Sequence, residues 1–323
     1  MISCDILSLG FAIPRRRIDD CPVPGYDEDS ITLAVQAALK AKGDAPPPEA
    51  LIFAVEKSPL AEKRAPSLIG DTLGMSPDSL YRQEEEGKAA LHLAGELIDD
   101  NTCRNVLVVQ AGTTGAALLL GKCEESIGYP VREEIDDDFP ALARRVDRSS
   151  KGDLIFPDEN IVFRLGFSPG KSGFEAESSR GYDIPADRKK IPAFDENGFG
   201  SEIMEMRNRR LWRSLEAQRC LTCKTIITLP LPNCPICGWS SKRELFPLKR
   251  IGRIFSFTLE HYFPTPEPPL GMAIVDLDGG GRLTLQVADN QAPLRVNDRV
   301  ELVFRRLHNA GRRPNYFWKA RHV

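Results

Sequence analysis

Residues 219–238 read RCLTCKTIITLPLPNCPICG, in which two Cys-x-x-Cys pairs are separated by ten residues. Four thiolates suit tetrahedral Zn²⁺, and a tight turn brings both sulfurs of one pair to a single ion. The spacing predicts the two knuckles of a structural zinc ribbon, with no open position for catalysis. Gly238 can adopt the positive φ that follows a knuckle. The expected ligands are Cys220, Cys223, Cys234 and Cys237; four unrelated cysteines or a redox pair is the alternative.

The residues on both sides of the ribbon predict a helix and a barrel. Residues 202–219 contain five arginines and read as a basic helix. After the ribbon, strand-like segments separated by Gly and Asp/Asn turns lie at residues 252–262, 272–277, 282–287, 300–304 and 316–320. Several short antiparallel strands within about 75 residues are typical of a small closed barrel.

The first part of the chain has a different pattern. Residues 1–125 alternate between strand-like segments, at 6–13, 51–55 and 106–109, and helix-like segments that begin at Ser30, near Pro66 and at Gly87. We expect Ser30 to cap its helix and Gly74 to end the next one. The wholly apolar run at 106–109 predicts a strand buried on both faces of a parallel sheet. Strands alternating with helices indicate an α/β architecture.

Residues 126–201 carry little periodicity. They include the acidic run at 133–138 and a segment rich in Pro, Gly and Ser, with one helix expected near 139–145. We interpret the segment as a linker, and the acidic run as a solvated surface rather than a metal site. The predicted organisation is multidomain: 1–125, the linker 126–201, a helix and ribbon at 202–245, and a barrel at 246–323.

The formal net charge of -3 conceals two opposite parts. Residues 206–323 contain 20 Lys/Arg and 9 Asp/Glu, a net of +11, whereas residues 1–205 contain 23 and 37, a net of -14. Such a division indicates two units with different partners, or two units that face each other. No apolar run approaches the roughly 20 residues of a membrane helix. Without a visible signal peptide, we expect a cytoplasmic protein without a disulfide framework.

Motifs in residues 202–323 resemble, in order, the zinc-ribbon and OB-fold proteins of the DUF35 type, which accompany thiolase-like enzymes. They are LWxxL from Leu211, RCxxC from Arg219, CPxCG from Cys234, GxIxSFT from Gly252, PPxGMA from Pro268 and PNYFWK from Pro314. The resemblance implies a rubredoxin-like zinc ribbon, a small OB-fold barrel and a thiolase-type partner.

Residues 1–125 resemble the start of the hydroxymethylglutaryl-CoA synthase branch of the thiolase superfamily. The motifs are GFAIPR from Gly10, PGYDEDSIT from Pro24, FAVEKSP from Phe53, GKAAL from Gly87 and VLVV from Val106. The resemblance implies a thiolase-like half domain in which Glu56 stands at the family's catalytic glutamate.

The departures from that family argue against catalysis. Three residues before Gly87 the family has a nucleophilic cysteine, and here the residue is Glu84, which cannot exchange a thioester. About 80 unpatterned residues follow this half, too few for a second one. None of His92, His261, His308 and His322 lies where the family's histidine is expected. We expect a truncated, inactive half domain in which Glu56 is a relic.

Two other cysteines are candidate nucleophiles. Cys103 and Cys123 flank the predicted strand region around 106–109. A free buried cysteine usually acts as a small apolar residue, which is the simpler interpretation. An independent acyltransferase with a displaced nucleophile would require one of them.

Basic and aromatic residues gather near the end of the chain: Arg305, Arg306, Arg312, Arg313, Tyr316, Trp318 and Lys319. Guanidinium groups can hold the phosphates of coenzyme A, and an aromatic ring can stack on adenine. The same composition also fits a single-stranded nucleic-acid groove, or a barrel strand with solvated arginines and core aromatics.

These observations favour a non-catalytic accessory subunit in a hetero-oligomer. Its partner would be a thiolase or hydroxymethylglutaryl-CoA synthase-like protein that supplies the catalytic cysteine for chemistry on a β-ketoacyl-CoA. Zn²⁺ would be structural, and a coenzyme A thioester would be the ligand of the complex. A nucleic-acid-binding ribbon and barrel is the alternative, but the acidic first part would repel phosphates.

Overall fold

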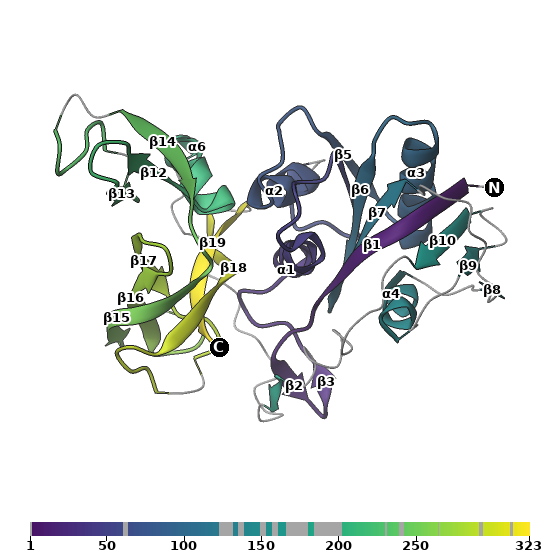
Figure 1. The fold of residues 1–323 in the computed structure, drawn as a ribbon. Helices are drawn as coiled ribbons and strands as arrows, with labels where there is room; N and C mark the ends of the chain where they lie inside the picture. Colours follow the sequence, from purple (N-terminus) through teal and green to yellow (C-terminus); the bar gives the residue numbers. More distant parts are fainter. Residues whose placement is uncertain are drawn as a thin grey trace. The chain divides into compact units, whose positions relative to one another are not determined.

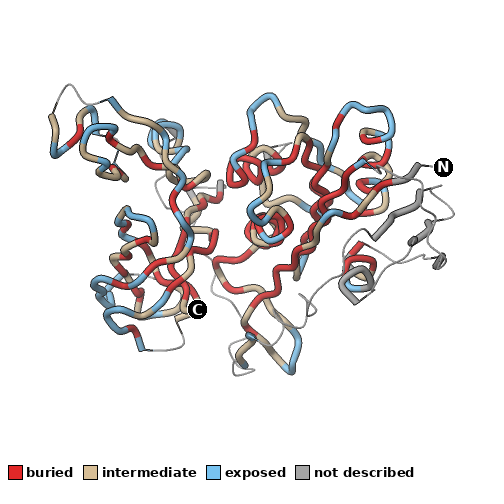
Figure 2. The backbone as a smooth tube through the Cα atoms, viewed as in Figure 1, coloured by how far each residue is buried: buried red, intermediate tan, exposed pale blue. Residues whose placement is uncertain are grey.

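The computed structural model describes residues 2–60, 64–122, 132–134, 139–148, 153–156, 161–165, 180–183, 202–229, 231–238, 242–263, 265–290, 293–310 and 313–323. The chain divides into two compact units, Met1–Lys189 and Lys190–Val323. Figure 1 shows the elements of each unit, and Figure 2 shows where each is buried.

Unit 1 is built on one mixed sheet with the strand order β5-β4-β6-β7-β1-β10-β9-β8 among the described residues. Strand β4 is parallel to both β5 and β6, whereas β7 is antiparallel to its neighbours β6 and β1. The strands are β1 (Ile2–Ala12), β4 (Ala50–Ala54), β5 (Leu80–Glu84), β6 (Asn105–Ala111), β7 (Gly115–Lys122), β8 (Arg132–Glu134), β9 (Asp153–Phe156) and β10 (Ile161–Leu165).

Helices cover both faces of this sheet. Helices α1 (Ser30–Lys42) and α2 (Arg64–Thr72) contact each other on one face, and α3 (Gly87–Asp99) and α4 (Phe139–Arg148) lie on the other (Figure 1). Side chains from α3 and α4 form one apolar cluster with β1, β4, β6 and β7. The buried strand at 106–109 is confirmed, since these residues are 0% exposed, and it is parallel to β4 but antiparallel to β7. The α/β prediction is therefore confirmed.

The start of α1 differs from the prediction by one residue. Asp29, not Ser30, is the N-cap, and its carboxylate accepts a hydrogen bond from the Thr32 backbone N–H at 3.0 Å. The Asp29 backbone N–H in turn donates to the Thr32 hydroxyl at 2.8 Å, which completes a capping box. Both residue types cap helices well, so composition alone does not separate them.

The segment predicted as a linker contributes strands to unit 1. Strand β10 is parallel to β1, β9 pairs with β10, and β8 pairs with β9. A further strand, β11 (Tyr182–Asp183), joins β2 (Arg16–Ile18) and β3 (Cys21–Pro22) in a small sheet. Each strand is short, and β10 and β11 pair with strands far away in sequence, so local periodicity does not reveal them. The helix expected at 139–145 is confirmed as α4, whereas most of the acidic run lies outside the described residues.

Unit 2 begins with a shorter helix than expected. Helix α6 (Glu202–Arg209) passes into a π-helical turn, η2 (Arg210–Ser214), and Leu215 ends it with a left-handed φ of 54°. The remainder of the predicted helix is strand β12 (Glu216–Cys220), which pairs with β13 (Ile226–Ile227) and β14 (Arg243–Pro247). Trp212 of η2 meets Phe317 of β19 edge to face, with ring centroids 6.0 Å apart.

The predicted barrel is confirmed. Its strands are β15 (Ile251–Glu260), β16 (Leu270–Leu277), β17 (Arg282–Gln286), β18 (Arg299–Ala310) and β19 (Arg313–His322). They run in the order β17-β16-β15-β18-β19, and a bridge between Val287 and Ala320 joins the two ends. Three glycines with φ near +90° form the turn between β16 and β17, where other residues would be strained. No helix in the described part of the chain is long and apolar enough to cross a membrane.

Candidate functional sites

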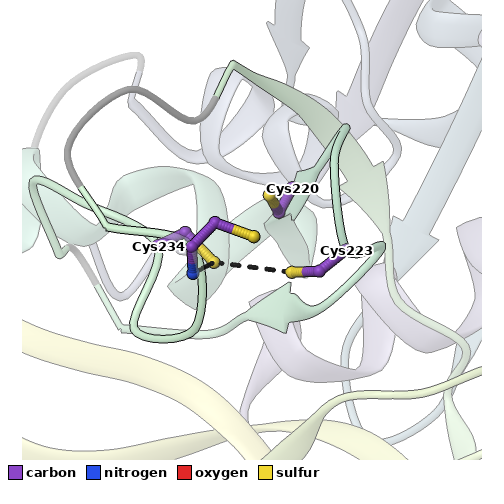
Figure 3. A group of neighbouring side chains, drawn as sticks. Cys220, Cys223 and Cys234 are labelled. Atoms are coloured by element: carbon purple, nitrogen blue, oxygen red, sulfur yellow. Dashed lines mark hydrogen bonds between the residues drawn. The ribbon is translucent and has the colours of Figure 1, made fainter.

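The four cysteines of the ribbon lie together in unit 2. All four Sγ atoms are within 4.8 Å of one another, and the Sγ atoms of Cys223 and Cys234 are 3.7 Å apart. Figure 3 shows the side chains of Cys220, Cys223 and Cys234 converging on a common centre. A tetrahedral ion with Zn–S bonds of about 2.3 Å separates its sulfurs by roughly 3.8 Å. The spacing of the thiols thus suits a tetrahedral metal ion.

The two knuckles have the same backbone geometry. The N–H of Lys224 donates to the Cys220 carbonyl at 2.9 Å, and the N–H of Gly238 donates to the Cys234 carbonyl at 2.9 Å. Both donors have positive φ, 62° for Lys224 and 80° for Gly238. The prediction for Gly238 is confirmed, whereas Lys224 in the same conformation was not anticipated. Its position directly after the first Cys-x-x-Cys pair is the signal that could have revealed it.

Hydrogen bonds prepare one thiol for deprotonation. The Thr225 hydroxyl lies 3.0 Å from Cys223 Sγ and, with its backbone N–H, lowers the pKa of the Cys223 thiol to about 6. The thiol of Cys223 in turn raises the pKa of Cys237 to about 12. Backbone N–H groups of Ile236 and Cys237 approach Cys234 Sγ at 3.4 Å. A metal binds the thiolate form of cysteine. Because the pKa of Cys223 is lowered, protons compete with a metal ion least at this one of the four sulfurs.

Replacing Thr225 by valine should make metal binding more sensitive to acid. Without the hydroxyl, the pKa of Cys223 rises towards its ordinary value, and protons displace the metal at higher pH. We expect the pH of half-release to rise by roughly half a unit, measured with a chromogenic chelator. Thr222→Val, which removes a hydroxyl from the same knuckle, is the matched control. An unchanged release curve for Thr225→Val would contradict this role.

In unit 1 the counterparts of the family's catalytic residues, Glu84 and Glu56, lie at or just after the ends of two neighbouring parallel strands, β5 and β4. Glu84 is half-buried at the end of β5, and its carbonyl accepts a hydrogen bond from the Val55 N–H at 2.9 Å. Glu56, two residues after the end of β4, is exposed. The N-terminus of α3 follows Glu84, at the place where a nucleophilic cysteine would gain from the helix dipole.

Side chains pack against one side of that helix terminus, at Gly87, whereas Glu85 and the N-cap residue Glu86 are exposed. Gly87, the first residue of α3, is buried, and a methyl group on it would overlap Gln110 Oε1 and Cβ of Phe139. Phe139 comes from α4, is 1% exposed and belongs to the apolar cluster of α3 and the sheet. The segment that the sequence analysis interpreted as a linker therefore supplies a side chain that packs against Gly87.

The other candidate nucleophiles are not activated where the structure describes them. Cys103 is buried, and burial raises the pKa of its thiol, which keeps it protonated. Cys123 lies outside the described residues. His92 Nε2 lies 3.3 Å from the Glu96 carboxylate on the surface of α3, one helical turn away.

The C-terminal cluster is mostly buried. Arg305 is 0% exposed, Trp318 and Lys319 are 1% exposed, and Tyr316 is 8% exposed, whereas Arg306 is half-buried. Phe304 meets Trp318 edge to face at 5.3 Å, as in a barrel core. Arg312 and the side chain of Arg313 lie outside the described residues.

Sequence reasoning missed the acidic partners of this cluster. Arg305 Nη2 lies 3.3 Å from Asp289 Oδ2, and Arg321 Nη1 lies 3.6 Å from the same oxygen. Arg321 Nη2 also lies 2.8 Å from Glu301, its cross-strand neighbour in β18. Opposite charges often face each other in paired strands. Once β18 and β19 are expected to pair, this preference could have revealed Glu301 as the partner of Arg321.

Comparison with known proteins gives two sets of relatives. The family described as ChsH2, C-terminal OB-fold domain, matches residues 247–305. A DUF35 domain-containing scaffold protein of Methanothermobacter thermautotrophicus is 32% identical over 113 residues, which cover 32% of this chain and 84% of the relative. The hydroxymethylglutaryl-CoA synthase of Pyrococcus furiosus is 29% identical over 136 residues, which cover 35% of this chain and 39% of the synthase. A solved structure titled Ltp2-ChsH2(DUF35) aldolase is 25% identical over 40% of this chain and 98% of its own, with a TM-score of 0.29.

Proposed function

Because this chain belongs to the DUF35 family and carries a thiolase-like part, we propose that it is a non-catalytic accessory subunit of a thiolase-type complex. The partner, a thiolase or hydroxymethylglutaryl-CoA synthase-like protein, provides the cysteine for chemistry on a β-ketoacyl-CoA. One observation carries the proposal: Glu84 stands where the hydroxymethylglutaryl-CoA synthase family has its nucleophilic cysteine. The methanogen relative is named as a DUF35 domain-containing scaffold protein, which supports the same assignment.

We assign Zn²⁺ as the ion of the ribbon. The ligand set consists of four thiolates, which zinc prefers, and their spacing matches its tetrahedron. With four protein ligands the ion has no free position, so its role is to hold the ribbon in shape.

The proposal extends to contact with acyl-CoA or the partner by the C-terminal cluster. Arg306 supports this contact because its side chain is partly exposed, so that a phosphate can approach the guanidinium group. Buried cations such as Lys319 would add positive potential behind it.

Co-expression with a thiolase-type subunit tests the function. We expect a stable hetero-oligomer that turns over acetoacetyl-CoA, and no turnover by this chain alone. Mutation of the partner's nucleophilic cysteine should abolish the activity of the complex. Turnover by the isolated chain, or failure of every thiolase-type subunit to associate with it, would overturn the proposal.

Restoring a cysteine at the family's position should not restore chemistry. In Glu84→Cys the new thiol still lacks the family's catalytic histidine, because none of the four histidines lies where that residue is expected, so the thiol is not activated towards an acyl thioester. Mass spectrometry after incubation with acetyl-CoA should show no acetyl adduct at position 84, and thiolysis should stay at background. Cys21→Ser, which alters an exposed thiol elsewhere in unit 1, is the control. An acetyl group at position 84 of the variant would contradict this expectation.

A further inference from the structure

A groove lies between α6 with η2 and the ribbon sheet of unit 2, and we call it the α6–ribbon groove. The groove is open to solvent, and its empty volume of about 430 Å³ includes open solvent. Its apolar lining comes from both sides: Leu211 from η2, Ile227 from β13, Leu229 after it and Leu245 from β14. Leu229 is 64% exposed and Leu245 is 48% exposed, so the groove presents apolar surface to solvent.

The apolar surface continues along α6 beyond the groove. At 100° per residue, Ile203 and Met204 lie on the same side of α6 as Arg207 and Leu211, which line the groove. Ile203 is 63% exposed and Met204 is 47% exposed. Packing within the described part of unit 2 leaves both side chains exposed on an eight-residue helix, and contiguous exposed apolar groups mark interaction sites.

The rim of the groove is basic. Arg207 and Arg210 line it, and both are exposed. Glu216 is the acidic residue of the lining, and its carboxylate lies 3.5 Å from Arg210. The nearby Glu205 carboxylate pairs with Arg213. The positive charge at the rim therefore exceeds the negative charge, which favours an acidic ligand.

We propose that the α6–ribbon groove is the docking site for an acidic amphipathic segment of the partner protein. Apolar side chains of the segment would lie against Leu229, Leu245 and Met204, and its carboxylates would face Arg207 and Arg210. This is the mode in which a helix lays its apolar face in a groove. The described lining holds no aromatic ring, so it offers no stacking platform for nucleic-acid bases. The inference rests on the proposed function, since the partner is the thiolase-type subunit.

Two variants of the full-length chain test the inference against the purified thiolase-type subunit. Arg207→Glu with Arg210→Glu reverses the rim, and Leu229→Ser with Leu245→Ser removes the apolar anchors. We expect each to raise the Kd of the complex at least about 10-fold, the rim variant most strongly at low salt. The matched control, Arg295→Glu with Val296→Ser, changes an exposed basic and an exposed apolar residue of the barrel and should bind normally.

The readouts separate this inference from the proposed function. Unchanged zinc content in each variant shows that the ribbon is folded. If the wild-type chain does not bind the subunit, the proposed function fails. If the wild type binds and both groove variants bind equally well, the groove is not the docking site. The groove variants could also bind the subunit normally but lose self-association or binding to a single-stranded oligonucleotide. Either outcome would overturn the proposal that the groove is the docking site for the subunit.

Discussion

Replacing Cys234 by serine is expected to abolish metal binding and to unfold the ribbon, while unit 1 keeps its structure. The apolar core of the ribbon is very small: Cys220, Ile227 and Cys234 are its buried members, with Cys223 and Cys237 packed against them. Four of these five residues are the proposed metal ligands. Without the ion the ribbon has almost no apolar surface to bury, and small domains of this kind depend on a metal or disulfides.

The expected loss of folding free energy in the ribbon is large. Structural Zn²⁺ contributes roughly 10–16 kcal/mol in zinc-finger peptides near neutral pH, which exceeds what a domain of this size gains from packing. We expect about one zinc per wild-type chain and none in Cys234→Ser, measured by elemental mass spectrometry. Proteolysis should then cut within residues 216–247. A chelator should reproduce both effects in the wild type.

The control variant is Cys103→Ser, which alters a cysteine outside the cluster. Its zinc content should equal that of the wild type. Acid should act like the chelator, because protonation of the thiolates displaces the ion, so ribbon stability falls as pH decreases. A ribbon that stays resistant to protease after complete removal of zinc would contradict the assignment.

Sequence patterns within a short stretch of the chain predicted the ribbon, the barrel strands and the buried strand of unit 1. The doubled Cys-x-x-Cys spacing specifies the ribbon because ligand geometry restricts the sequence between Cys220 and Cys237. The barrel strands and the buried strand at 106–109 were predicted from their polarity. Helix α6 was predicted too long, because the arginines continue into strand β12 and nothing local distinguishes Leu215, which ends the helix with positive φ.

Features that depend on distant residues were missed. Strand β10 is recognisable only through its pairing with β1, roughly 160 residues earlier in the chain. The burial of Arg305 and Lys319 is equally non-local, since arginine and lysine are usually exposed and their neighbours come from several strands. Of the candidate site in unit 1, the loss of the cysteine was visible at Glu84, whereas the packing of Phe139 against Gly87 required the fold.

Replacing Phe139 by alanine should destabilise unit 1 by about 3–5 kcal/mol, the usual cost of deleting a large aromatic side chain from a packed core. Phe139 is 1% exposed and lies in one apolar cluster with Leu91, Leu118 and Leu142. Its loss would leave a cavity beside Gly87 and weaken the attachment of α4 to the sheet. Denaturant unfolding of the full-length chain should show a separate early transition for unit 1.

The control for this prediction is Tyr262→Ala, which removes an aromatic side chain that is 97% exposed in unit 2 and should cost less than about 0.5 kcal/mol. Amide exchange distinguishes a local effect from a global one, since protection should fall first in α4 and at the start of α3. If Phe139→Ala leaves both stability and exchange unchanged, Phe139 does not contribute to the packing of α3 and α4 on the sheet. The inactivity proposed for unit 1 rests separately on the glutamate at position 84.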